Sequence, residues 1–303
     1  MKNSTIVAGL CVMLAVLGCK VTSENVSSKT TKTMTEVVPN KLGGCVFVSP
    51  QNTVEVKPNN GRIEIEKLEG AFAKKMTVYG MSFIAMEAVS DEFLTEVRKT
   101  MQEMFPQEEG FNLKKQHEVL TYLAQYKATI PVIKGHHDEM PEKVMEELQE
   151  LYEPTCSVCD VIMYQVPLQT MEVVEHLLHF VSDIGLHYAF PEEWSFTDKN
   201  ASIHKVMEEA IAKGFYDVGS YEAMMGEKNI YQRVVVQEFA YWLISTYWNI
   251  QETYGPDEDE WKLKTRKDLQ RQLPMGFELV DTTVGKIMKV PSRQLLEKLN
   301  QFQ

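Results

Sequence analysis

The sequence predicts an α+β fold, with a small strand-and-helix first half followed by a mostly helical second half. Two observations lead to this prediction. Short apolar stretches with strand-like alternation alternate with helical segments up to about residue 166, whereas the chain beyond residue 200 consists of helix-length segments. With 303 residues, 44% of them hydrophobic and 24% charged, the chain is long and apolar enough to bury a sizeable core.

The first half alternates strand and helix signals. Alternating apolar and polar residues on both sides of Pro-Asn-Asn-Gly predict a β-hairpin over 53–67. Further strands are predicted at 76–86, 128–133 and 160–166. Helices are predicted where capping or helix-starting residues precede amphipathic stretches, at 91–105 after Ser90, at 116–126 and at 141–152.

The second half is predicted to be mostly helical. Its helices are expected at 173–187, 203–213, 231–250 and, more briefly, from about 265, 276 and 292. No internal repeat interrupts this pattern. We therefore expect one globular domain over 42–303, with the hairpin region at about 42–70 as a small appendage.

The N-terminus is typical of an export signal. Lys2 precedes a 12-residue apolar run at 6–17, which is too short to span a bilayer because a span takes about 20 residues. The run ends in Val-Leu-Gly-Cys, which resembles the lipobox of bacterial lipoproteins, where the cysteine, here Cys19, carries the lipid. The resemblance implies a signal peptide at 1–18 and a palmitate-type membrane anchor in the cell envelope. The alternative is a plain secretory peptide cut nearby.

Composition and the residue after Cys19 set three further expectations. Residues 19–41 are rich in Ser, Thr and Lys, cannot bury a core, and are predicted to form a flexible tether. Lys20 after the cysteine, rather than Asp, favours an outer membrane if the host has one. The net charge of −12 argues against a nucleic-acid partner, which would require a basic face.

The helix predicted at 173–187 carries an unusual polar face. At about 100° per residue its apolar side chains share one arc, opposite a narrower arc of acids and histidines. That arc contains Glu172, Glu175, His176, His179 and Asp183. Side chains three or four residues apart on a helix can reach one ion, and carboxylate and imidazole are both ordinary zinc ligands. The face is therefore a candidate zinc site.

The window Glu175-His176-Leu-Leu-His179 contains the residue types of H-E-x-x-H with the first two letters exchanged. In one assignment Glu175 and His179 are ligands and His176 stands where the catalytic base would be. In the other, His176 and His179 are ligands and Glu175 is the base. The sequence leaves both assignments open, together with a third in which these side chains form a polar cluster without an ion.

A third ligand is predicted in the second long helix. The stretch 234–248 is so apolar that it must be largely buried, yet it contains Glu238. A lone buried carboxylate is costly and requires a cation, a hydrogen-bond donor or a metal. We therefore expect Glu238 to lie within roughly 5 Å of an imidazole nitrogen of His176 or His179, since ligands about 2.0 to 2.2 Å from one ion cannot be farther apart.

The region from about 77 to 250 resembles a gluzincin-type metallopeptidase domain. In such domains an H-E-x-x-H helix supplies two ligands and a later helix supplies a glutamate, and here Glu-His-Leu-Leu-His and Glu238 occur in that order, with Glu238 59 residues after His179. The resemblance implies a zincin-like second half, zinc bound by Glu175, His179 and Glu238, and a peptide or protein substrate. The exchanged letters keep a second hypothesis open, a non-catalytic envelope lipoprotein that binds a peptide or protein partner.

The other candidate residues lie outside this pattern. Cys156 and Cys159 form Cys-x-x-Cys, which in an exported chain indicates a local disulfide, with redox or metal use involving Cys45 as the alternative. His136 and His137 and the acidic stretch 254–261 are interpreted as solvated loops. His117 begins an H-E-x-x-H window that lacks its second histidine.

Overall fold

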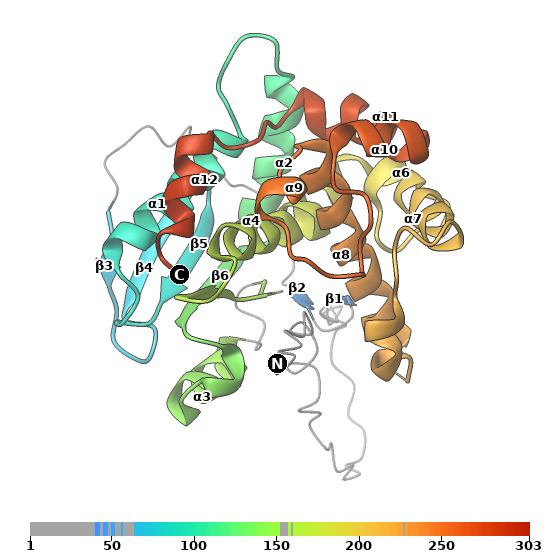
Figure 1. The fold of residues 1–303 in the computed structure, drawn as a ribbon. Coiled ribbons are helices and arrows are strands. Elements are labelled where there is room, and N and C mark those ends of the chain that lie inside the picture. The colour runs from blue at the N-terminus through green and yellow to red at the C-terminus, as the bar shows by residue number, and fades with distance from the viewer. Residues whose placement is uncertain are drawn as a thin grey trace, which may run out of the picture.

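The computed structural model describes residues 40–42, 45–47, 50–51, 56, 64–151, 157–158, 160–226 and 228–303. Within them, a five-stranded sheet belongs to the first half and the second half is mostly helical (Figure 1). The predicted α+β class is confirmed. None of the helices in these ranges is both long and apolar enough to cross a membrane.

The main sheet has the order β3-β4-β5-β6-β7. Its strands are β3 (Glu66–Lys67), β4 (Lys74–Val78), β5 (Met81–Ala85), β6 (Thr129–Lys134) and β7 (Ile162–Tyr164). The first three strands pair antiparallel, and β6 and β7 join in parallel through crossovers that contain helices. A separate antiparallel pair consists of β1 (Asn40–Leu42) and β2 (Cys45–Phe47).

One strand prediction needs revision. The single strand expected at 76–86 is wrong, because the chain reverses at Tyr79 and Gly80, whose φ angles are 49° and 82°. Two consecutive positive φ values are typical of a tight hairpin turn, so β4 and β5 are neighbours in the sheet. The hairpin expected at 53–67 lies mostly outside the described residues, but its last residues form β3 and pair with β4.

The helices described in the first half are α1 (Asp91–Met104), α2 (Leu113–Gln125) and α3 (Glu142–Leu151). The first two begin at polar caps. Ser90 accepts a hydrogen bond from the Phe93 amide at 3.1 Å, and Asn112 caps α2 through the Lys115 amide in the same way. The α3 side chains Val144 and Leu148 cover one face of the sheet, and the other face packs into the larger core shared with the helical half.

Two helices connect the halves of the molecule. The first, α4 (Gln169–Phe180), follows β7, continues as a π-helical turn η3 (Val181–Leu186), and ends in α5 (His187–Ala189). The second, α8 (Lys228–Tyr247), packs against α4. Figure 1 shows α4 between the sheet and α8. The remaining helical elements are η2 (His137–Glu139), α6 (Pro191–Trp194), α7 (Ser202–Ala212), η4 (Gly219–Met224), α9 (Gln251–Tyr254), α10 (Arg266–Gln272), α11 (Pro274–Thr282), η5 (Val284–Lys286) and α12 (Arg293–Asn300).

Gly185 allows the π-helical turn to pack closely on α2. A Cβ atom at this position would lie 2.7 Å from Cγ1 of the buried Val119. We expect Gly185→Ala to lower the free energy of unfolding by about 1 to 3 kcal/mol, as overpacking of a core does. Denaturant titration measures this change. Gly226→Ala, where the added Cβ meets nothing within 4 Å, serves as the control, and equal effects of the two substitutions would contradict the packing argument.

Candidate metal centre

The N-terminal turn of α4 is fixed to strand β7 by side-chain hydrogen bonds. Gln169 accepts from the Gln165 amide at 2.7 Å and donates to the Met163 carbonyl at 2.7 Å. Glu172 accepts from the Met163 amide, also at 2.7 Å. These bonds hold α4 in one rotation about its axis, so its acid-and-histidine face is directed away from solvent. His179 is fully buried and His176 is 5% exposed.

Glu238 on α8 reaches this face. Its Oε2 lies 3.5 Å from Nε2 of His179, within the separation that the sequence analysis expected. That distance is long for a hydrogen bond, but two ligands each about 2.1 Å from one tetrahedral ion lie about 3.4 Å apart. Glu175, His179 and Glu238 together offer three ligand atoms within 4.8 Å of one another. The structure therefore contains a buried His and Glu group that could hold a metal ion.

Asp160, which the sequence analysis did not identify, orients His179. Its Oδ2 lies 2.8 Å from Nδ1 of His179, so this nitrogen carries the proton. Nε2 of His179 is buried and faces Glu238 without a well-formed hydrogen bond, and its lone pair becomes available when a cation displaces the proton from this nitrogen. A carboxylate on one imidazole nitrogen and an open lone pair on the other is the usual arrangement around a metal-binding histidine. An acid immediately before a buried strand was the only sequence signal for Asp160.

A hydrogen-bonded network holds Asp160 in place. Its Oδ1 accepts from the Val161 amide at 2.9 Å, and its Oδ2 lies 3.3 Å from Nε2 of Gln237. Arg233 donates to Gln237 and pairs with Asp183 at 3.0 Å. The network thus connects the start of β7, the π-helical turn after α4, and α8. All its members are buried, so each polar group depends on the others for a partner.

His176 lies on the other side of Asp160. Its Nδ1 is 2.6 Å from the Glu172 carbonyl oxygen and 3.2 Å from the Glu172 carboxylate, and its Nε2 is 3.4 Å from Oδ1 of Asp160. Asp160, His176 and His179 form a second group with ligand atoms within 4.8 Å. Because Asp160 and His179 already share a hydrogen bond, the group around Glu238 accommodates an ion more readily. The role of His176 as a base stays a prediction.

Burial and charge shift the pKa values around the site. Burial alone would raise the pKa of Asp160, but His176 and His179 hold it well below its usual range. Burial and the charge of Glu238 raise the pKa of Glu175 to about 8. Although burial lowers the pKa of His179, Glu238 and Asp160 raise it to about 10. The metal-free site therefore retains protons at neutral pH, and a bound cation would displace them.

The other predicted residues do not join this site. Cys19, Cys156 and Cys159 lie outside the described residues, so the lipidation and disulfide predictions stay predictions. Cys45 is part of β2. His136 is exposed before η2, consistent with a solvated loop, whereas the neighbouring His137 is half-buried.

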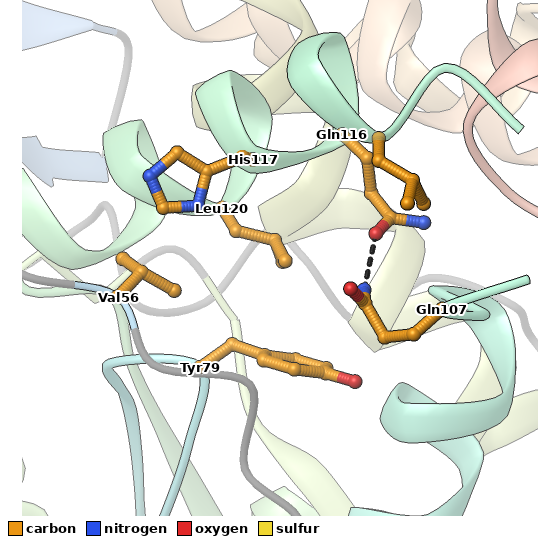
Figure 2. A pocket seen from close by; sticks show the side chains of 7 residues that line it. Val56, Tyr79, Gln107, Gln116, His117 and Leu120 are labelled. Carbon is orange, nitrogen blue, oxygen red and sulfur yellow. Dashed lines mark hydrogen bonds between the residues drawn. The ribbon is translucent and has the colours of Figure 1, made fainter.

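His117 lines a small cavity instead. This cavity of about 30 Å³ lies along α2, and Figure 2 shows His117, Leu120, Tyr79 and the hydrogen-bonded pair Gln107 and Gln116 around it. Its volume corresponds to one or two water-sized spheres. No member of the metal centre lines it, and it is too small for a peptide substrate.

No protein-family model matches this chain, and no curated protein or solved structure matches it either.

The raised pKa of Glu175 predicts how the metal-free protein responds to pH. The folded state retains a proton on Glu175 up to about pH 8, whereas the unfolded chain releases it near its ordinary value of about 4.5. The contribution of Glu175 to the free energy of unfolding is therefore complete below the unfolded pKa and is lost as pH rises through the folded one. We expect Glu175→Gln to flatten the decline in stability of the EDTA-treated protein between pH 5 and 8. Parallel pH profiles from denaturant titration would refute this electrostatic picture.

Proposed function

We propose that this protein is a zinc-binding, zincin-like metalloprotein in which Glu175, His179 and Glu238 are the ligands. The observation that carries the proposal is the buried, unpartnered Nε2 of His179, 3.5 Å from Glu238. Two ionised carboxylates and one neutral imidazole suit zinc and balance its charge of +2. Asp160 supports the same assignment, since it fixes the tautomer that leaves Nε2 free.

Peptide hydrolysis is the activity that we propose for this centre. Three protein ligands leave a fourth position, as catalytic zinc sites do, and a bound zinc ion would supply Lewis-acid chemistry there. Glu238 and Glu175 would hold the ion, and Asp160 would keep the imidazole of His179 oriented. Glu175 is half-buried, so the ligand set is not fully enclosed.

One observation favours the non-catalytic alternative. Both nitrogens of His176 lie close to acceptors on Glu172 and Asp160, so this residue would have to leave them before acting as a base. In this second candidate the ion stabilises the junction of α4 and α8, and the lipoprotein binds a peptide or protein partner without cleaving it.

We further propose that Cys19 anchors the protein to a membrane of the cell envelope. The Val-Leu-Gly-Cys ending of the apolar run supports this address. Residues 19–41 would then separate the membrane from the folded domain. Lys20 favours the outer membrane if the host has one.

Metal analysis tests the ligand assignment. We expect one zinc per chain in protein expressed with ample metal, and loss of that zinc in His179→Ala, measured by inductively coupled plasma mass spectrometry. Asp160→Asn should retain zinc with an affinity lower by about 10- to 100-fold, because it removes an orienting group and no ligand. Glu238→Ala should lower the melting temperature of the zinc-loaded form more than that of the metal-free form.

The control for this experiment is His136→Ala, which changes an exposed histidine and should leave the zinc content unchanged. A wild-type protein without any bound transition metal would overturn the proposal.

Zinc-dependent cleavage of labelled casein separates the two candidates. Activity that disappears with His179→Ala supports a peptidase, and a zinc-loaded protein that cleaves nothing supports the non-catalytic alternative.

Labelling with a fatty-acid analogue tests the anchor. We expect the mature protein to label and to fractionate with membranes, and Cys19→Ser to abolish both. Cys11→Ser, a change within the apolar run, is the matched control and should label normally. Undiminished labelling of the Cys19 variant would show that the lipobox assignment is wrong.

A further inference from the structure

His176 repeats the geometry of His179 on the other side of Asp160. Its Nδ1 lies 2.6 Å from the Glu172 carbonyl oxygen, an acceptor that requires a proton on this nitrogen. Its Nε2 lies 3.4 Å from Oδ1 of Asp160. That distance is long for a hydrogen bond, but it matches the separation of about 3.4 Å between two ligands of one tetrahedral ion. A backbone carbonyl that holds one imidazole nitrogen and leaves the other for an ion is the usual surrounding of a metal-binding histidine.

Asp160 presents a different oxygen to each imidazole. Its Oδ2 lies 2.8 Å from Nδ1 of His179, whereas its Oδ1 faces Nε2 of His176. Oδ1 also accepts from the Val161 amide at 2.9 Å. A carboxylate oxygen offers about two lone-pair sites, so an amide hydrogen bond does not prevent the same oxygen from binding an ion. Asp160 and His176 therefore present two ligand atoms at a suitable separation.

His179 belongs to two groups of candidate ligands in the described part of the chain. One group joins it to Glu175 and Glu238, and the other joins it to Asp160 and His176, with ligand atoms within 4.8 Å of one another in each. Nε2 of its ring faces the first group and Nδ1 faces the second. An imidazole that has lost both protons can bind one ion at each nitrogen. The second group is buried throughout, with Asp160 6%, His176 5% and His179 0% exposed.

We propose that Asp160 and His176 hold a second divalent transition-metal ion, which the ring of His179 bridges to the first. The inference rests on the proposed zinc centre and adds a metal site to it. The second ion takes the place of the protons that the two imidazoles direct toward Asp160, and these protons leave to solvent. The charges balance, because the Asp160 carboxylate and the His179 imidazolate together carry two negative charges. Imidazole and carboxylate ligands suit zinc and copper.

The two positions fill in a fixed order. At the first position Glu238 and His179 already lie 3.5 Å apart, which is close to the ligand separation around a tetrahedral ion. At the second, Oδ2 of Asp160 and Nδ1 of His179 are 2.8 Å apart and must separate to about 3.4 Å to admit an ion between them. The second ion therefore binds more weakly than the first.

This assignment uses His176 in the position where it lies. As a base it would have to leave its acceptors on Glu172 and Asp160, whereas as a ligand it keeps the bond to the Glu172 carbonyl and binds the ion at Nε2. The exchanged letters of the Glu175-His176 pair then have a chemical consequence. The carboxylate belongs to the group of Glu238, and the imidazole belongs to the group of Asp160.

Equilibrium dialysis of the full chain against increasing zinc, followed by mass spectrometric metal analysis, tests the second site. We expect wild type to bind a second, weaker zinc at saturation. His176→Ala should keep the first zinc and lose the second, and Asp160→Asn should also lose the second while retaining the first. His204→Ala is the matched control, because it removes another buried histidine, 7% exposed, that belongs to neither group of candidate ligands and should leave two zinc ions bound.

Copper(II) tests the bridge, since it binds nitrogen and oxygen ligands more tightly than zinc does. We expect the second equivalent of copper added to the metal-free wild type to lower the low-temperature electron paramagnetic resonance signal per copper, because exchange through an imidazolate pairs the two spins. In His176→Ala the signal of the first copper should persist.

The outcomes separate this inference from the proposed function. A wild type that binds a single zinc at saturation would overturn the second site and leave the zinc centre standing. Additive signals from two independent copper ions would overturn the bridge, and equal losses of zinc in His176→Ala and His204→Ala would overturn the ligand assignment. A protein that binds no transition metal would overturn both proposals.

Discussion

The burial of Glu238 inside an apolar helix is the constraint on which the centre of the molecule depends. An isolated buried carboxylate destabilises a fold strongly, and the neighbouring side chains of α8 leave it little access to water. The fold offsets this cost by packing α8 against α4, so that Glu238 faces His179. The same contact buries Glu175 beside Glu238, and burial together with the repulsion between the two carboxylates raises the pKa of Glu175 to about 8.

The helix contact requires a second layer of polar groups. His179 could rotate or exchange its proton, but Asp160 holds Nδ1, and Gln237 with Arg233 holds Asp160. These residues belong to three separate segments, so the orientation of one imidazole depends on the sheet, the π-helical turn and α8 together. Removing the polar side chain of any residue in this network would leave a buried polar group without its partner. The effects of such substitutions on the free energy of unfolding should therefore not be additive.

The candidate metal centre is asymmetric, because the hydrogen-bonding of its polar groups differs between its two sides. On the sheet side, α4 is joined to β7, and the polar groups there are paired through Glu172, Gln169 and Asp160. On the side of α9 and the following loop, Tyr241, Gln251 and Glu258 keep unpaired atoms.

The sequence by itself determined the α+β class, the bounds of most helices and the acid-and-histidine face of α4, because local periodicity and capping act within a few residues. It also determined that Glu238 needed a partner, since burial follows from the apolar stretch around it. Only the tertiary structure decided that Asp160 holds His179, that His176 turns toward Glu172, and that the acidic loop attaches to Trp242. These contacts join segments that are distant in the chain or depend on one helix rotation. No local sequence pattern predicts such a contact, because the packing of the whole core determines which segments meet.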